Sequence, residues 1–338
     1  MLKKAESLEK LLEICPPNKV IADNLIKAWT FINDEKYEKI VCSISGGSDS
    51  DVMLDIVWRC DKDNKVEYVW FNTGLEYKAT KEHLKFLEKK YNIEIKPYRA
   101  IKPIPTTCRE YGQPFLSKIV SKYIYNLQKH GFKWEDKSFE ELKREYKGMD
   151  SYLKWWCNCN SFKSFNVGRN KWLKEFLIEN PPTFKISDKC CHYAKKNVAH
   201  KCIKENGYKL NIIGVRRAEG GIRSASYKSC FDNNGKTYDN FRPLFWYKDS
   251  DKQEYEEYYD VQHSDCYTVY GFKRTGCCCC PFGGDDVQHE LDAIEVYEPN
   301  LFKAVNNIFG DSYEYTKRYR EFCKMKNEEE KRLKERNK

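Results

Sequence analysis

Short apolar runs alternate with amphipathic segments over about the first hundred residues of the chain. The runs at 39–45, 66–72 and 93–100 are rich in β-branched and aromatic side chains, which favour strands. Between them, residues 51–60 and 80–91 carry apolar side chains at helical spacing. Strands that alternate with helices predict an α/β fold, with an open, mostly parallel sheet and helices on both faces.

The rest of the chain adds one strand and several helical parts. Residues 5–33 and the charged stretch from about 313 predict helices, and residues 210–215 predict a strand. Ser138 and Glu141 have the spacing of a capping box, within a segment of short helices. We therefore expect an N-terminal helical segment (1–35), an α/β domain formed by 36–116 and 183–275, a helical insertion (117–182), and a cysteine-rich segment with C-terminal helices (276–338).

Composition and charge add little to the predicted fold and function. The chain has 338 residues, of which 41% are hydrophobic and 33% are charged, as in ordinary globular proteins. No stretch approaches the ~20 apolar residues that a membrane span needs, and the N-terminus lacks an apolar signal core. We therefore expect a cytoplasmic protein with no membrane partner. The net charge of +9 is compatible with an anionic partner, but a solvated, lysine-rich surface explains it more simply.

The stretch SISGGSDS at residues 43–50 joins a predicted strand to the helix that follows it. Glycines let the backbone approach an anion closely and adopt positive φ. The unpaired N–H groups and the dipole at a helix start favour negative charge, and the serines add hydroxyl donors. The alternative is an ordinary strand–helix turn. The stretch lacks the Gly-Lys-Ser/Thr of a Walker A loop and the spacing of a dinucleotide fingerprint.

Two further groups of polar residues follow predicted strands. The second strand leads into the turn formed by Asn72, Thr73 and Gly74. The strand at 210–215 leads into a stretch that holds Arg216, Arg217 and Arg223. The carboxyl ends of parallel strands share one edge of the sheet, where ligands bind, and guanidinium groups suit phosphate or sulfate oxygens. The alternatives are an ordinary Asn-Gly turn and a surface patch of ion pairs.

Sixteen cysteines are many for a chain in which we expect no signal peptide, so metal ligation or redox chemistry is a better explanation than disulfides. They include two clusters, Cys190 with Cys191 and Cys277 through Cys280. Two such clusters can meet around one centre, and four thiolates in this mixed spacing suit a [4Fe–4S] cluster, because each iron takes one thiolate. A zinc site and buried structural cysteines are the alternatives. Cys278 and Cys279 leave the ligand choice open by one residue, and Cys230 is a substitute ligand to consider.

These motifs together resemble a known family. Residues 45–50, SGGSDS, resemble the PP-loop of the ATP pyrophosphatase superfamily, which holds the pyrophosphate part of a nucleotide. The NTG turn resembles the segment after the second strand in the phosphoadenosine-phosphosulfate (PAPS) reductase family. The stretches KCC, IIGVRRAEGGIRSA, RPLFWYKDSDKQEY and RTGCCCCPFG resemble segments of adenylyl-sulfate reductases and PAPS reductase-like proteins. The resemblance covers about residues 39–302 apart from the middle segment, and it implies the adenine nucleotide alpha hydrolase-like fold.

The resemblance implies a role for each matching residue of this chain. The implied nucleotide contacts are Ser45, Gly46, Gly47, Ser48, Asp49, Ser50, Asn72, Thr73, Gly74, Arg216, Arg217 and Arg223. The implied catalytic residues are Asp49 and Arg217. The implied ligands of the [4Fe–4S] cluster are Cys190, Cys191, Cys277 and Cys280.

The resemblance implies an enzyme that binds ATP or an adenylyl sulfonucleotide with Mg²⁺ and adenylates a substrate for sulfur transfer, releasing pyrophosphate. The implied partners are the nucleotide, a tRNA or DNA substrate, and a cysteine desulfurase or thioredoxin-type donor. One alternative is an adenylyl-sulfate or PAPS reductase that releases sulfite, although Cys323 is isolated and lacks the ECGIH-like context of those enzymes. The other is an iron–sulfur nucleic-acid-binding module without turnover, whose aromatic residues at 130–175 stack on bases.

Overall fold

The computed structural model describes residues 4–220, 226–233 and 237–336. The chain forms two compact units, and each is described by itself. The first unit comprises Met1–Pro103, Tyr193–Cys278 and Asp292–Glu298, and the second comprises Ile104–His192, Cys279–Leu291 and Pro299–Lys338. Within the described ranges, no helix is both long enough and apolar enough to cross a membrane.

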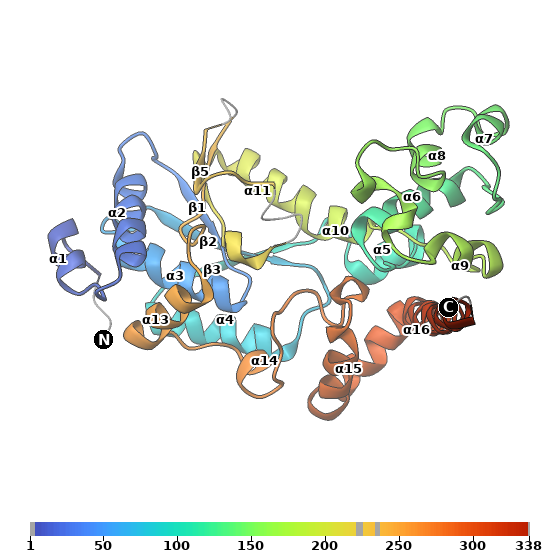
Figure 1. Cartoon of the computed structure of the whole chain (residues 1–338). Helices are drawn as coiled ribbons and strands as arrows, with labels where there is room; N and C mark the ends of the chain where they lie inside the picture. Colours follow the sequence, from blue (N-terminus) through green and yellow to red (C-terminus); the bar gives the residue numbers. More distant parts are fainter. Residues whose placement is uncertain (1–3, 221–225, 234–236, 337–338) are drawn as a thin grey trace. The chain divides into compact units, whose positions relative to one another are not determined.

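The first unit is built on a sheet (Figure 1). Among the described residues the sheet has six strands in the order β3-β2-β1-β4-β6-β5. Their bounds are β1 Ile40–Ser43, β2 Val66–Asn72, β3 Ile95–Arg99, β4 Leu210–Ile212, β5 Phe231–Asp232 and β6 Asp239–Phe241. The four pairings of β1, β2, β3, β4 and β6 are parallel, and β5 is antiparallel to β6. This confirms the predicted open, mostly parallel sheet.

Helices cover both faces of this sheet, because successive side chains of a strand point to opposite faces. Ile40 and Cys42 of β1 belong to the large core that includes residues of α2 (Lys19–Asn33), α3 (Ser48–Cys60) and α4 (Lys78–Tyr91). Val41, between them, belongs instead to a smaller cluster with residues of α11 (Asn197–Asn206). The start of α2 is fixed by a nearby residue of the sequence. Asn18 caps this helix by accepting hydrogen bonds from the N–H groups of Val20 and Ile21.

The first unit contains further helices and helical turns. Their bounds are α1 Leu8–Glu13, α13 Asp249–Tyr259, α14 Asp265–Thr268, the 3₁₀ turn η4 Arg217–Glu219 and the π-helical turn η3 His192–Lys196, which begins at the last residue of the second unit. Helix α3 is buried from Ser50 to Cys60. It therefore forms the centre of the core, and its first turn is held in a fixed position at the carboxyl edge of the sheet.

The second unit is helical in the part of the chain that the structure describes. Its elements are α5 Ile104–Tyr111, α6 Lys118–Lys129, α7 Phe139–Glu145, α8 Asp150–Trp156, η1 Lys163–Phe165, η2 Val167–Arg169, α9 Leu173–Glu179, α10 Lys189–Cys191, η5 Pro281–Gly283 and α16 Pro299–Arg336, while α15 Asp286–Tyr297 is divided between the units. The capping box predicted at Ser138 and Glu141 is present at the start of α7. Helix α16 begins at Pro299 rather than near residue 313, because proline is well tolerated in the first helical turn.

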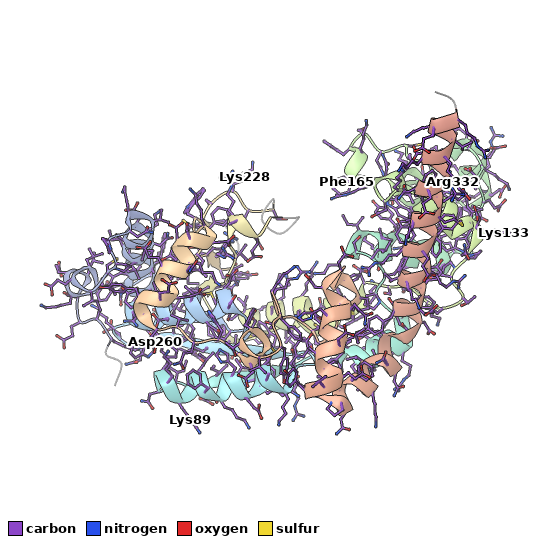
Figure 2. All side chains as sticks on the ribbon, turned by 60° about the horizontal axis from the view of Figure 1, so that its bottom comes forward. Lys89, Lys133, Phe165, Lys228, Asp260 and Arg332 are labelled. Atoms are coloured by element: carbon purple, nitrogen blue, oxygen red, sulfur yellow. The ribbon has the colours of Figure 1, made fainter. Side chains whose placement is uncertain are left out.

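Aromatic side chains fill the core of the second unit. Trp155 and Trp156 are 1% and 0% exposed, and the Phe176 ring lies 4.9 Å from the ring of Tyr315 on α16. These tryptophans were candidates for base stacking, and in the folded unit they form core contacts instead. Phe165, labelled in Figure 2, is an exception, because its side chain is 46% exposed. Figure 2 also marks Arg332 near the C-terminal end of α16.

Candidate functional site

The glycine turn lies between β1 and α3, as the sequence predicts. Gly46 has a φ of +70°, in the left-handed region that favours glycine. A Cβ atom at this position would lie 2.9 Å from Cγ2 of Thr80, on α4. Gly47 is the N-cap residue of α3 and has no side chain to cap the helix. Both glycines therefore bring bare main chain to the start of α3.

Hydroxyl oxygens accept hydrogen bonds from the N–H groups of this loop. The Ser45 N–H donates to Ser50 Oγ at 2.9 Å, and the Gly47 N–H donates to Ser45 Oγ at 3.3 Å. The Ser48 N–H donates to Tyr267 Oη at 3.0 Å, and the Thr275 N–H donates to the same oxygen at 3.1 Å. The sequence predicted bare donors, whereas the folded loop satisfies them with neutral oxygens. A phosphate oxygen would replace a neutral acceptor with a charged one, which makes a stronger hydrogen bond.

Two cations approach the first turn of α3. Arg216 Nε donates to Asp49 Oδ1 at 2.9 Å, and Arg216 Nη1 donates to Asp249 Oδ1 at 2.7 Å. Lys252 Nζ, on α13, donates to Ser48 Oγ at 3.1 Å and lies 3.7 Å from Asp49 Oδ1. The Arg216 and Lys252 side chains are only 10% and 14% exposed. Lys252 was not among the residues that the sequence singled out, although it lies within the stretch that carries the family resemblance.

The Arg216 guanidinium and the carboxylates next to it shift one another's pKa values. Burial acts to lower the pKa of Arg216, but the hydrogen bonds and charges of Asp249 and Asp49 outweigh burial and raise it. The hydrogen bond and charge of Arg216 in turn lower the pKa of Asp249. The arginine therefore stays charged, and it holds the carboxylate of Asp49 in one orientation.

The other two predicted arginines have different surroundings. Arg217 is exposed, its N–H donates to Phe245 O at 2.9 Å, and its guanidinium carbon lies 5.7 Å from the centroid of the Trp246 ring. Arg217 therefore lies next to Arg216 in the sequence but contacts an aromatic face rather than the loop. Arg223 lies outside the described residues.

The second predicted turn folds at the end of β2, beside β1 in the sheet. Asn72 Oδ1 accepts a hydrogen bond from the Gly74 N–H at 2.9 Å. Thr73 donates to Glu76 Oε1 through both its N–H, at 3.1 Å, and its hydroxyl, at 2.6 Å. Burial raises the pKa of Glu76, against the opposing effects of Lys195 and Thr73. Because β1 and β2 are parallel neighbours, this turn and the glycine turn share the carboxyl edge of the sheet.

A partly buried chain of hydrogen bonds and ion pairs connects Lys252 to Asp51 within α3. His263 Nδ1 lies 2.9 Å from Asp51 Oδ2, and His263 Nε2 lies 2.8 Å from Glu256 Oε1. Glu256 Oε1 is also 2.8 Å from Lys252 Nζ. Burial acts to lower the pKa of His263, but the two carboxylates outweigh burial and raise the pKa to about 9. A protonated histidine therefore links the interior of α3 to the lysine at its first turn.

Several thiols gather in the second unit. The thiol of Cys190, on α10, is hydrogen-bonded to those of Cys108 on α5 and Cys191, and the Cys280 thiol lies near enough to act on it electrostatically. Of the predicted ligands, Cys190, Cys191 and Cys280 belong to this unit, and Cys277 belongs to the first unit. Cys108 was not predicted, because it stands alone in the sequence with no cysteine near it.

The donor set suits a soft metal centre, since thiolates are the ligands of iron–sulfur clusters and of zinc. Among the residues that the structure describes, no three or more His, Cys, Asp or Glu side chains are arranged to hold a single metal ion. The thiols therefore suit an iron–sulfur cluster by their chemistry alone.

The sheet, the glycine turn at its carboxyl edge and the cations at the start of α3 form the arrangement that the PP-loop resemblance predicts. Residues 39–117 match the family model described as "Phosphoadenosine phosphosulfate reductase domain". This segment is therefore similar to the PAPS reductase domain. The resemblance predicted from the sequence is confirmed.

Comparison with known proteins adds distant likenesses. No curated protein matches the sequence. Similar solved structures include PAPS reductase from Candida auris in a phosphate complex, with a TM-score of 0.41 and 11% identity, covering 82% of this chain and 97% of that one. Another is U34-tRNA thiolase NcsA from Methanococcus maripaludis with its [4Fe-4S] cluster, with a TM-score of 0.38 and 12% identity, covering 91% and 81%.

Proposed function

We propose that this chain binds ATP, or an adenylyl nucleotide, at the glycine turn and adenylates a substrate for sulfur transfer. The observation that carries the proposal is the pair of cations at the first turn of α3. Arg216 and Lys252 each contact the loop residues Ser48 or Asp49, and both are largely buried. Partly buried cations beside main-chain N–H groups form a site for an anion with several oxygens, such as pyrophosphate.

In the proposed reaction, a substrate oxygen attacks the α-phosphorus of ATP. The bond from the α-phosphorus to the bridging oxygen breaks, and pyrophosphate leaves with the bonding electron pair. Lys252 and the loop N–H groups stabilise the charge on the departing pyrophosphate, while Arg216 orients Asp49. Mg²⁺, when bound with the nucleotide, neutralises phosphate charge, and the carboxylate of Asp49 is an oxygen ligand suited to it. A sulfur nucleophile then displaces AMP from the adenylated substrate. Arg217 is the second catalytic candidate, as the family resemblance implies.

The thiols of the second unit support the sulfur-transfer part of the proposed reaction. Cys190, Cys191 and Cys280 belong to the unit, and Cys277 is the fourth ligand that the family resemblance implies. A [4Fe–4S] cluster held by these thiols would supply iron that binds sulfur or passes electrons. A tRNA or DNA substrate and a cysteine desulfurase as sulfur donor are the partners that this reaction requires. A thioredoxin-type donor would serve the reductase instead.

The test is pyrophosphate release by protein purified and reconstituted without oxygen. We expect release from ATP in the presence of tRNA or DNA, with incorporation of sulfur into the same nucleic acid when a desulfurase and cysteine are supplied. We also expect a brown protein that absorbs in the visible range because of thiolate–iron charge transfer. A colourless protein that holds one zinc, or a protein that never releases pyrophosphate, would contradict the proposal.

A sulfonucleotide reductase is the second candidate, because the matching family model is that of PAPS reductase. Such a reductase needs a thiol that reaches the sulfonate group. Cys323 lies within the long helix α16, and its Sγ is hydrogen-bonded to Lys171 O at 3.5 Å. A thiol held inside a helix is poorly placed to move to a substrate. We therefore expect no thioredoxin-dependent sulfite release from adenylyl sulfate or PAPS, and release that is lost in Cys323→Ser would favour this candidate.

A nucleic-acid-binding module without turnover is disfavoured. Trp134, Trp155 and Trp156 are 8%, 1% and 0% exposed, so their faces are not available to stack on bases. Binding of nucleic acid with no nucleotide turnover in the presence of any substrate would restore this alternative.

A further inference from the structure

Lys252 lies closer to a carboxylate on its own helix than to the glycine loop. Its Nζ atom is 2.8 Å from Glu256 Oε1, compared with 3.1 Å from Ser48 Oγ and 3.7 Å from Asp49 Oδ1. Lys252 and Glu256 are four positions apart on α13, and their side chains are only 14% and 18% exposed. A lysine side chain has several rotatable bonds, and fixing them costs conformational entropy. The ion pair with Glu256 therefore fixes the ammonium group before a ligand arrives.

The carboxylate of Glu256 is itself held by His263. The same oxygen, Oε1, lies 2.8 Å from His263 Nε2, while His263 Nδ1 lies 2.9 Å from Asp51 Oδ2. Asp51 is 0% exposed, and its N–H donates to Gly47 O at 3.0 Å in the first turn of α3. The contacts therefore run from the first turn of α3, through His263, to the carboxylate that holds Lys252.

Both ring nitrogens of His263 face carboxylate oxygens, so the protonation of the ring decides how many hydrogen bonds it donates. A protonated imidazole donates from both nitrogens, whereas a neutral imidazole donates from only one. Asp51 on α3 and Glu256 on α13 face the ring, and the ring of Tyr267 on α14 lies 5.8 Å away. His83, on α4, lies 3.0 Å from the same Asp51 oxygen. Loss of one proton therefore removes the hydrogen bond from His263 to either Asp51 or Glu256.

Glu256 is the carboxylate that loses this hydrogen bond. Asp51 is fully buried, and a buried charge without a hydrogen bond costs much more free energy than a charge that reaches water. The Glu256 side chain is 18% exposed, so water can replace the imidazole as its partner. Once released from His263, Glu256 is free to turn toward solvent, and Lys252 then loses the contact that fixes its ammonium group.

We propose that Glu256 and His263 are positioning residues for Lys252, and that they make nucleotide use depend on the protonation of His263. The inference rests on the proposed function, because it concerns the cation assigned to the departing pyrophosphate. Protonated His263 fixes Glu256, and Glu256 holds the Lys252 ammonium group beside Ser48. Both residues act through the lysine rather than on the nucleotide.

The first test is a double-mutant cycle on pyrophosphate release from ATP. We expect Glu256→Gln to raise the KM for ATP by about fivefold and to lower kcat by less, since the charged partner of the lysine is lost. In the Lys252→Met background the same substitution should change neither quantity, because the lysine through which Glu256 acts is gone. Glu257→Gln, at the next and exposed position of α13, is the control and should match the wild-type protein. An equal effect of Glu256→Gln in both backgrounds overturns the proposal, because it indicates a purely structural role.

The second test is the pH profile of kcat/KM for ATP between about pH 7 and pH 10. Burial acts to lower the pKa of His263, but its two carboxylate partners raise the pKa to about 9. We therefore expect kcat/KM of the wild-type protein to fall by about fivefold as the pH passes about 9. His263→Gln should remove this step, because glutamine does not titrate. A step of the same size in His263→Gln, or no step in the wild-type protein, overturns the role of His263.

Folding and nucleotide binding are measured separately from turnover. Circular dichroism and thermal unfolding over the same pH range establish that the variants are folded, and Glu256→Ala is a second variant that should show at least the effect of Glu256→Gln. Titration calorimetry with a non-hydrolysable ATP analogue repeats the cycle without turnover. Folded Glu256 variants that bind the analogue as tightly as the wild-type protein overturn this inference and leave the proposed function intact. A wild-type protein that binds no analogue overturns the proposed function and the inference together.

Discussion

Arg216 Nε donates to Asp49 Oδ1 at 2.9 Å, although 167 positions separate the two residues in the sequence. The same guanidinium contacts Asp249 at the start of α13 through Nη1. One side chain thus connects the segment after β4, the glycine turn and α13. The charge of Arg216 and the orientation of Asp49 are the basis of the first prediction.

Arg216→Ala should weaken ATP binding by about tenfold to a hundredfold, since a charge-assisted hydrogen bond contributes about 1.5–3 kcal/mol. Isothermal titration calorimetry with a non-hydrolysable ATP analogue measures this effect. Lys89→Ala is the control, because Lys89 is an exposed cation on α4 of the same unit (Figure 2). Equal affinities of Arg216→Ala and Lys89→Ala would show that Arg216 does not contribute to the nucleotide site.

Lys252→Met should raise the KM for ATP and lower the rate of pyrophosphate release, each by about tenfold. The variant keeps most of the side-chain volume but removes the charge that lies 3.1 Å from Ser48 Oγ. Electrostatic stabilisation of a departing phosphate is lost when a positioned cation is removed. Steady-state kinetics measures both quantities. Gln253→Ala, the next residue on α13 and exposed, is the control, and a similar change in both variants would argue against a specific role for Lys252.

Gly46→Ala should destabilise the fold by about 1–2 kcal/mol, because an L-residue pays this cost in the left-handed region. The new methyl group also meets Cγ2 of Thr80. The double variant Gly46→Ala with Thr80→Ser removes that contact and should recover part of the loss but not the backbone cost. Urea unfolding measures each free energy, with Thr80→Ser alone as the reference. An unchanged stability of Gly46→Ala would contradict the loop geometry.

Stability should fall as the pH rises through the range in which His263 deprotonates. The pKa of His263 rises from its ordinary value of 6.5 to about 9 in the folded protein, because the hydrogen bonds to Asp51 and Glu256 outweigh burial. A raised histidine pKa stabilises the fold fully below about pH 6.5, and this contribution is lost as the pH passes about 9. The free energy of unfolding should therefore fall by up to about 1.4 kcal/mol for each pH unit in between.

His263→Gln is the variant that isolates this effect. Glutamine can still hydrogen-bond to the two carboxylates but carries no proton that titrates. Urea unfolding between about pH 6 and pH 10 should give a flatter pH dependence for the variant than for the wild type. Parallel curves for the two proteins would assign the pH dependence to other groups.

Local patterns in the sequence were enough to predict the framework of the first unit. The runs at 39–45 and 66–72 contain β1 and β2, because strand formation depends on a period of two in nearby residues. The turn at Gly46 was also predictable, since its requirement for glycine is a property of a few consecutive peptide units. These motifs, with their order along the chain, identified the PP-loop class correctly.

Only the tertiary structure decided which side chains meet across long stretches of sequence. Lys252 reaches Ser48 across 204 positions, and Tyr267 reaches the same residue across 219 positions. Cys108 has no neighbouring cysteine in the sequence, and it lies near Cys190 only because α5 and α10 pack together. Such contacts depend on how whole helices pack, and hydrophobic periodicity specifies which face of a helix is buried but not which distant side chain it will meet. The sequence by itself therefore determined the kind of loop and the class of fold, while packing decided which cations and which thiols surround the two candidate sites.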